Sequence, residues 1–293
     1  MRSLIVSDFD LAHTVQSAQP LAFFGDPSGD GNGVTYACGG SLVEARQAGS
    51  RLEYTAYGAI GGRRLDREIA ARFRLEDDMR SVYAAIETDA FMRRATKRYR
   101  GLRITKNGPW ETALCFVISQ FNNVKRIRGI VKRLITAYGE EHALDSGGVR
   151  LSFRSFPEPE ALAKAGVRDL MAHGAGFRAR YIKALAEECS GSVDLGGLGG
   201  KGYEGAKEAL MELDGIGDKV ADCILLFGYG RLNAFPIDTW VQRAMERTYF
   251  GGRRQSIGRL HEFAEKRWGP YAGYAQQYMF WAFRNSGKGR AGV

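Results

Sequence analysis

The sequence has few cysteines and lacks any long apolar run. Its four cysteines (Cys38, Cys115, Cys189 and Cys223) are scattered, and no two of them form a CxxC pair. This spacing excludes a disulfide framework, a zinc ribbon and the four-cysteine loop of an iron–sulfur cluster. Charges or glycines interrupt every apolar stretch before the roughly 20 residues that a membrane helix needs, and the N-terminal apolar core is too short for a secretory signal. We therefore expect no membrane attachment and no secretion.

Positive charge is what the sequence has in excess. Among 293 residues, 42 lysines and arginines stand against 33 aspartates and glutamates, so the formal charge is +9. A hydrophobic content of 44% is typical of a globular protein and argues against general disorder. The charge favours a polyanionic partner, although a basic surface alone is also a common solubility feature.

Two regions with different periodicity follow one another. Short β-rich runs at 21–24, 34–38 and 52–57 alternate with turn-rich clusters, which predicts a twisted antiparallel sheet. Farther along, apolar residues recur at helical spacing. We predict an α+β fold, with an N-terminal antiparallel-sheet domain with flanking helices over residues 1–107 and a mainly α-helical domain over residues 108–293. Helices are expected at 110–119, 124–138, 158–165, 177–189, 205–213, 218–227, 239–249 and 256–284, with a mobile glycine-rich connector at 191–205.

The segment 213–223 (LDGIGDKVADC) carries the most informative pattern. Gly215 and Gly217 allow a tight turn between one helix and the next, and amide groups at a helix N-terminus form an anion site suited to a DNA phosphate. This pattern is typical of a helix-hairpin-helix. For an isolated GxG, a glycine-capped turn without any ligand is the commoner explanation.

Two charged residues near this hairpin suggest chemistry. Lys219 lies in the first turn of the second helix, where the helix dipole disfavours a positive charge and favours the neutral amine that a nucleophile needs. An exposed lysine without a role is an equally weighted alternative. Asp238 (in FPIDTW) is a natural N-cap for the helix at 239–249, and a fixed, ionised cap can also stabilise a cationic transition state.

At these residues the sequence resembles the helix-hairpin-helix-Gly-Pro-Asp superfamily of DNA glycosylases, and within it the 8-oxoguanine DNA glycosylase/AP lyase branch of eukaryotic type. The matching motifs are LDGIGDKVADCILL (213–226), AFPIDTWVQR (234–243), NNVKRIRGIVKRL (122–134), GFRARYI (176–182) and WGPYAGYAQQYMF (268–280). The resemblance implies a bifunctional enzyme that excises 8-oxoguanine from duplex DNA and nicks the strand by β-elimination through a lysine Schiff base.

The resemblance also implies roles for individual residues. Lys219 matches the catalytic lysine and Asp238 the catalytic aspartate. The phosphate-binding hairpin is matched by Gly215, Gly217 and Val220. A monovalent cation would rest on the carbonyls of Met211, Leu213 and Ile216.

A further group of residues matches the family's base pocket. Gln276 would read the Watson–Crick edge of the extruded base and Phe280 would stack on its face, although core packing in this aromatic helix is the alternative. Cys223 either packs under the base, modulates the protonation of Lys219, or is an inert buried thiol. Ala18 stands where the family has a glycine whose carbonyl recognises N7 of 8-oxoguanine.

Other residues match positions that contact the rest of the duplex. The hole left by the flipped base and the estranged cytosine are contacted by Asn122, Arg126, Phe177 and Arg178. Arg126 alternatively belongs to a plain basic helix face. The chain departs from the family at Phe121, where an asparagine is usual, and at Trp240, where a phosphate-binding histidine is usual. The first departure puts strict discrimination for cytosine opposite the lesion in doubt.

These expectations define the overall prediction. No cofactor is required, no iron–sulfur cluster is expected, and the partner is double-stranded DNA containing oxidised guanine. We expect a monomer located in the cytoplasm or nucleoid of a prokaryote or in the nucleus of a eukaryote. The alternatives are a glycosylase for another damaged base, such as an alkylated purine, and a non-catalytic helix-hairpin-helix DNA-binding protein.

Overall fold

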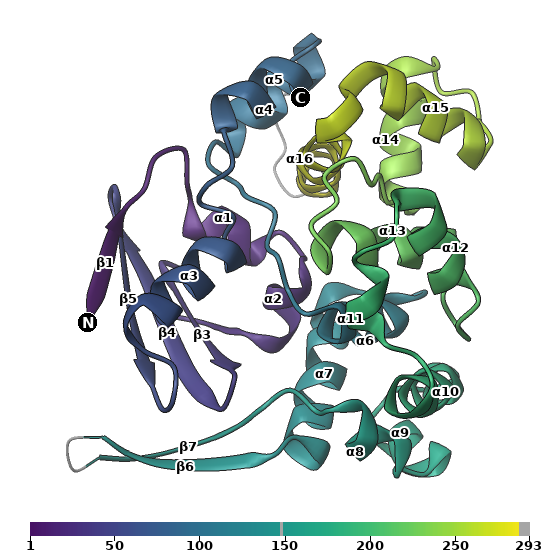
Figure 1. Ribbon diagram of the computed structural model, residues 1–293. Coiled ribbons are helices and arrows are strands. Elements are labelled where there is room, and N and C mark those ends of the chain that lie inside the picture. Colours follow the sequence, from purple (N-terminus) through teal and green to yellow (C-terminus); the bar gives the residue numbers. More distant parts are fainter. Residues whose placement is uncertain (147–148, 287–293) are drawn as a thin grey trace.

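The N-terminal part of the protein is built around one antiparallel sheet (Figure 1). The computed structural model describes residues 1–146 and 149–286, so residues 147–148 and 287–293 of the predicted second domain lie outside the described residues. The five strands run in the order β1-β5-β4-β3-β2. Their bounds are β1 (Arg2–Ile5), β2 (Asp26–Pro27), β3 (Gly33–Cys38), β4 (Ser41–Ala48) and β5 (Arg51–Tyr57). The predicted antiparallel sheet is confirmed.

Alternation along the strands decides which face of the sheet is buried. In β5, Leu52 and Tyr54 are buried while Glu53 and Thr55 are not, as the period of two predicts. The predicted strand at 21–24 is wrong, because this segment is the helix α2 (Pro20–Phe24). Pro20 occupies the first turn, where its fixed φ favours a helix and its missing N–H costs nothing.

The N-terminal part has further helices, of which α4 (Met79–Ile86) and α5 (Ala90–Arg98) pack on the C-terminal part. The other two are α1 (Leu11–Gln16) and α3 (Gly62–Arg72). In Figure 1, α4 and α5 lie beside α16 (Ala272–Asn285), and both contact it. The boundary between 107 and 108 stays a prediction; at that point the amide of Asn107 donates to the carbonyl of Phe227 at 2.7 Å.

The C-terminal part is mainly helical, as predicted. Its remaining helices are α6 (Pro109–Ser119), α7 (Val124–Tyr138), α8 (Pro159–Ala163), α9 (Val167–Ala172), α10 (Arg178–Gly191), α11 (Leu195–Leu198), α12 (Tyr203–Met211), α13 (Asp218–Phe227), α14 (Thr239–Tyr249) and α15 (Ile257–Trp268). No helix in the described part of the chain is long and apolar enough to cross a membrane.

Three features of this part differ from the sequence prediction. The helix expected over 256–284 is broken into α15 and α16 by Gly269, which has a φ of +49°, and a short 3-10 turn over Gly269–Tyr271. The glycine-rich connector contains α11, which Asp194 caps. A hairpin of β6 (Glu141–Ser146) and β7 (Val149–Arg154) follows α7 and was not predicted.

Candidate active site

The hairpin between α12 and α13 places the functional residues. Gly215 has a φ of +82°, and a Cβ added there would lie 2.7 Å from the side chain of Tyr181, so glycine is required on both counts. Gln120 Nε2 donates to the Gly215 carbonyl at 3.0 Å and ties the turn to the end of α6. Gly217 is the extended N-cap of α13, and Val220 is buried behind it. The predicted helix-hairpin-helix is confirmed.

Lys219 is half-buried on the first turn of α13. Its Nζ donates to Ser119 Oγ at 3.3 Å and lies 4.6 Å from the centre of the Phe116 ring. Within the described residues it forms no ion pair with a carboxylate. A lysine that a protein holds in a partly buried place without a counter-ion is available for chemistry with a ligand. Ser119 and Phe116 carried no signal in the sequence that pointed to this contact.

Asp238 caps α14 as predicted. Its Oδ1 accepts hydrogen bonds from the amides of Trp240 and Val241, at 3.0 and 2.8 Å. These bonds fix the carboxylate, while Oδ2 accepts no hydrogen bond in the part of the chain that the structure covers. The cap and a catalytic function are therefore compatible in geometry.

The thiol of Cys223 lies within electrostatic reach of both Lys219 and Asp238. Burial raises the pKa of Cys223 to about 12, while the nearby Lys219 opposes this increase and Asp238 adds to it. The thiol is only 2% exposed and stays protonated at neutral pH, so it is not a nucleophile. Cys223 is thus near Lys219 of its own helix and near Asp238, the N-cap of α14.

Gln276 on α16 is buried but incompletely satisfied. The side chain is 5% exposed, and its Oε1 has no hydrogen-bond partner. Its neighbour Gln277, equally buried, donates from Nε2 to the carbonyl of Ser17 at 2.7 Å. A buried polar atom without a partner is costly, and a bound ligand is one of the few reasons for keeping it. Gln276 is thus suited to receive a donor from outside the chain.

Phe280 and Arg284 extend this surface along α16. Phe280 is half-buried, and the Arg284 guanidinium lies 5.8 Å from its ring centre. Burial lowers the pKa of Arg284, and the proximity of Asp238 opposes that effect. The sequence did not single out Arg284, which lies beside Phe280 and near Asp238.

The turn carrying Ala18 is held against α16. Ala18 has a φ of +60°, a left-handed conformation in which glycine is usual and alanine is strained. The bond from Gln277 to Ser17 fixes one side of the turn. On the other side, buried Gln19 donates to the Arg103 carbonyl at 2.8 Å and accepts from the amide of Thr105 at 2.7 Å. The structure therefore brings the Ala18 turn and the Gln276 helix together, while recognition through the Ala18 carbonyl stays a prediction.

The residues predicted to contact the opposite strand gather at the turn between α6 and α7. Asn122 Nδ2 donates to the Ile118 carbonyl at 3.0 Å, Arg126 is exposed, and Phe177 is 53% exposed. Arg178 is only 3% exposed, and its guanidinium donates to the carbonyls of Gln120 and Phe121. Burial, with Arg126 nearby, lowers the pKa of Arg178. Contact of these residues with DNA stays a prediction, and Arg178 also has a structural use that the sequence did not indicate.

Two other predicted groups lie at the edges of the site. Trp240 is 41% exposed beside Phe283. Of the carbonyls predicted to hold a monovalent cation, that of Leu213 accepts from the Ile216 amide at 3.1 Å, and Met211 is the last residue of α12. Carbonyls at a helix C-terminus lack intrahelical donors, so the donor type fits, and the cation site stays a prediction.

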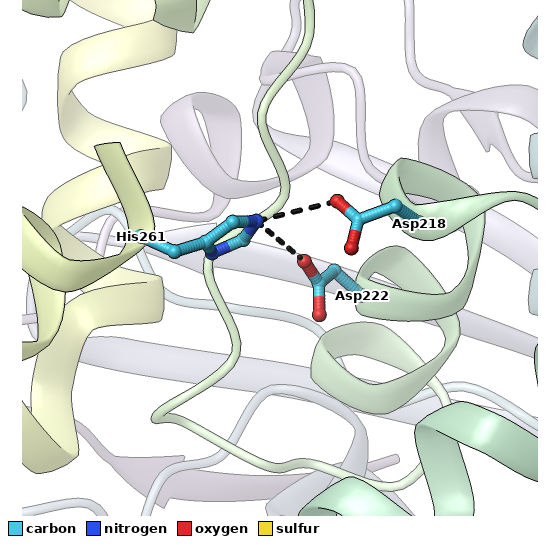
Figure 2. A group of neighbouring side chains, drawn as sticks. All are labelled: Asp218, Asp222 and His261. Atoms are coloured by element: carbon cyan, nitrogen blue, oxygen red, sulfur yellow. Dashed lines mark hydrogen bonds and ion pairs between the residues drawn. The ribbon is translucent and has the colours of Figure 1, made fainter. Parts of the chain in front are cut away.

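Asp218 and Asp222 of α13 belong to an ionic cluster with His261 that the sequence did not reveal (Figure 2). His261 Nε2 lies 3.2 Å from Asp218 and 3.6 Å from Asp222, which is fully buried. Lys207 Nζ lies 2.7 Å from Asp218 and 3.2 Å from Asp222, and the Tyr203 hydroxyl donates to Asp222. Two aspartates and a histidine resemble a metal-ligand set, but the Lys207 ammonium already forms ion pairs with both carboxylates. The i, i+4 spacing of the aspartates was the only sequence signal.

Charge in this cluster is distributed unevenly. The hydrogen bond from His261, assisted by Lys207, holds the pKa of Asp218 well below its usual range. Burial raises the pKa of Asp222 despite the opposing charge of Lys207. The cluster anchors α13 to α12 and α15, and so fixes the helix that carries Lys219.

Comparison with known proteins agrees with this geometry. Residues 114–270 match the model of the "HhH-GPD superfamily base excision DNA repair protein", and residues 3–113 match that of the "8-oxoguanine DNA glycosylase, N-terminal domain". The chain is 29% identical to the "Probable N-glycosylase/DNA lyase" of Methanothermobacter thermautotrophicus over 84% of its own length and 83% of that protein.

Solved structures give the same answer. The structure of MBOgg1 in complex with a low-affinity DNA ligand superposes with a TM-score of 0.87 at 29% identity, covering 96% of this chain and 94% of that one. The Clostridium acetobutylicum 8-oxoguanine glycosylase/lyase, bound to double-stranded DNA with cytosine opposite 8-oxoguanine, superposes with a TM-score of 0.86 at 25% identity and the same coverage. The chain belongs to the HhH-GPD superfamily of base excision DNA repair proteins.

Proposed function

We propose that this protein is a bifunctional DNA glycosylase and AP lyase that removes 8-oxoguanine from double-stranded DNA. The observation that carries the proposal is the half-buried Lys219, without a carboxylate partner among the described residues, whose neighbour Cys223 is also within reach of Asp238. A protein that only grips phosphate needs neither residue. The family membership and the resemblance to N-glycosylase/DNA lyases support both activities.

Base recognition comes first in the proposed reaction. The basic face of α7 and the amides at the start of α13 bind phosphates, and the damaged nucleotide leaves the stack at a cost of a few kcal/mol. Gln276 then accepts a hydrogen bond from the base at its otherwise unpaired Oε1, and Phe280 stacks on the base. The Ala18 turn, held against the same helix, contributes its carbonyl.

Excision and strand cleavage follow from the lysine. The neutral amine of Lys219 attacks C1′ while the N-glycosidic electron pair leaves with the base, which takes up a proton. The Asp238 carboxylate stabilises the positive charge that develops on the sugar. The amine has given up one proton, and its lone pair then forms the C=N bond as the ring C1′–O4′ bond breaks. O4′ takes up a proton from water, and the product is a protonated Schiff base. It acidifies the C2′ protons, so that removal of one of them expels the 3′ phosphate by β-elimination, and water then releases Lys219.

This chemistry requires no redox cofactor and no iron–sulfur cluster, since an amine and a carboxylate supply every step. If a monovalent cation binds to the carbonyls of Met211, Leu213 and Ile216, it would only add positive charge beside the bound phosphate. The proposed place of action is the compartment that holds the DNA, whether nucleoid or nucleus, and the proposed state is a monomer.

Borohydride trapping tests the proposal most directly. Incubation with duplex DNA containing 8-oxoguanine and borohydride is expected to give a covalent complex with the wild-type protein and none with Lys219→Gln. Lys97→Gln, which removes an equal charge from the exposed face of α5, is the matched control and is expected to trap normally.

The same experiment separates the rival functions. Excision is measured across duplexes containing 8-oxoguanine or an alkylated purine such as 3-methyladenine. Faster release of the alkylated base would reassign the substrate. Trapping of Lys219→Gln at the wild-type level would remove Lys219 from the mechanism, and binding without any release would leave only a DNA-binding protein.

A further inference from the structure

Two residues at the C-terminal end of α6 contact the amine of Lys219. Its Nζ donates to Ser119 Oγ at 3.3 Å and lies 4.6 Å from the centre of the Phe116 ring. Residues three apart on a helix are neighbours on its surface, so Ser119 and Phe116 meet the amine together. The Cys223 thiol is also within electrostatic reach, but a thiol is a much weaker hydrogen-bond partner than a hydroxyl. The Ser119 hydroxyl is therefore the group that holds an N–H of Lys219.

The proton of the Ser119 hydroxyl is already engaged. Ser119 Oγ donates to the Phe116 carbonyl at 2.7 Å, the local bond that a serine in the last turn of a helix commonly makes. A hydroxyl has one proton and two lone pairs, so an oxygen whose proton is used is left as an acceptor. The Ser119 oxygen can therefore hold an N–H of the amine, but it cannot donate to the lone pair of the nitrogen.

The Phe116 ring is fixed beside the amine. It stacks on Phe227 with ring centres 5.5 Å apart and planes 19° apart, and Phe23 contacts it edge-on at 6.4 Å. The side chain is buried, so the ring has little room to turn away. The face of an aromatic ring is electron-rich and accepts an N–H or faces a cation favourably. Phe116 thus offers Lys219 a second acceptor in a fixed place.

The end of α6 is tied to the hairpin that precedes Lys219. Gln120, which follows Ser119, donates from Nε2 to the Gly215 carbonyl at 3.0 Å. The buried guanidinium of Arg178 donates to the Gln120 carbonyl at 2.6 Å and holds the same turn from the other side. The acceptors on α6 and the lysine on α13 are therefore held in one relative position.

We propose that Ser119 is a positioning residue that directs the lone pair of Lys219 at the sugar carbon C1′. The inference rests on the proposed glycosylase and lyase function. A neutral amine has two N–H groups and one lone pair. The Ser119 oxygen and the Phe116 ring accept the two N–H groups, which leaves the lone pair on the side of the nitrogen that neither residue covers. After the attack, the same oxygen accepts the one N–H of the protonated Schiff base, and the ring face stabilises its positive charge.

Trapping on a preformed abasic site tests the positioning. The loss of one hydrogen bond in Ser119→Ala is expected to slow borohydride trapping and single-turnover release of 8-oxoguanine by a similar factor, about tenfold. Ser119→Thr keeps the hydroxyl and is expected to restore most of both rates. Ser190→Ala is the matched control, because Ser190 Oγ donates in the same way to the carbonyl of Glu187, three residues earlier on α10, and is exposed. The affinity of all three variants for a duplex with a tetrahydrofuran abasic analogue is expected to equal that of the wild type.

Several results would overturn the positioning. Ser119→Ala may not trap as fast as Ser190→Ala, nor owe a slower rate to weaker DNA binding alone. Equal slowing of Ser119→Ala and Ser119→Thr with lower melting temperatures would assign Ser119 to packing. A preformed abasic site has no base to lose, so a wild type that traps there without releasing 8-oxoguanine would refute only the proposed substrate, and the trapping rates would still decide the role of Ser119. A wild type that traps on neither duplex would overturn both proposals.

Discussion

The charged side chains of α13 differ in how they are satisfied. Asp218 and Asp222 meet Lys207, His261 and Tyr203 in a closed cluster. Lys219, which follows Asp218 in the sequence, has a hydroxyl and an aromatic ring as neighbours but no carboxylate among the described residues. One helix thus uses its aspartates to fix its position and leaves its lysine without a counter-ion.

The same contrast recurs within α16. Gln277 is satisfied by the Ser17 carbonyl, whereas the adjacent Gln276 leaves its Oε1 unpaired. The bond of Gln277 holds α16 to the Ala18 turn, while the unpaired Oε1 of Gln276 lies on the same helix as Phe280. An unpaired buried polar group lowers the stability of the fold, and hydrogen-bonded clusters elsewhere in the protein compensate for this loss.

The largest expected effect comes from removing the negative charge of Asp238, whose Oδ2 accepts no hydrogen bond among the described residues. Asn is also a good N-cap, so Asp238→Asn should keep α14 folded and DNA bound while losing the charge that stabilises the sugar cation. We expect single-turnover excision to fall about 10²- to 10³-fold, the size typical of losing one electrostatic stabiliser. Asp78→Asn, at the cap of α4, is the matched control. Turnover within a factor of two of wild type would reduce Asp238 to a cap.

The neighbouring glutamines should respond in opposite ways. Gln276→Leu removes a buried unpaired atom, so the melting temperature should stay the same or rise while 8-oxoguanine excision falls about tenfold or more. Gln277→Leu leaves the Ser17 carbonyl without its donor and should cost about 1–3 kcal/mol of unfolding free energy. Thermal unfolding and excision rates measure both. If Gln276→Leu is the less stable of the two and excises normally, the assignment of satisfied and unsatisfied roles is wrong.

The smallest expected effect is on the closed cluster at acid pH. The folded-state pKa of Asp218 lies below the usual 3.8, so its ionic contacts stabilise the protein above that pH and are lost as the pH falls through the lower, folded-state pKa. Asp218→Asn should therefore unfold less steeply with acid, measured as melting temperature from pH 6 to pH 3. Glu212→Gln, exposed on the same hairpin, is the control. An unchanged acid slope would contradict a role for this ion cluster in fixing α13.

Much of the site could be read from local sequence because its signals are local. Each signal depends on residues within one helical turn. The hairpin glycines and the N-cap at Asp238 follow the usual preferences for helix ends, and Lys219 departs from the preference for negative charge at a helix N-terminus. Gln276 and Phe280 could be assigned only by resemblance, since a buried glutamine looks the same in sequence whether its partner is the protein or a substrate. Gln277 shows that the distinction depends on a residue 260 positions away.

The sequence by itself determined the α+β order of elements, the basic character, the hairpin and the N-cap at Asp238, because periodicity, charge and capping act over a few residues. Only the tertiary structure decided that α4 and α5 pack on α16, that Arg178 holds the turn of Phe121, and that Cys223 is buried near both Lys219 and Asp238. These are contacts between distant segments, and their free energy exists only once the chain has folded.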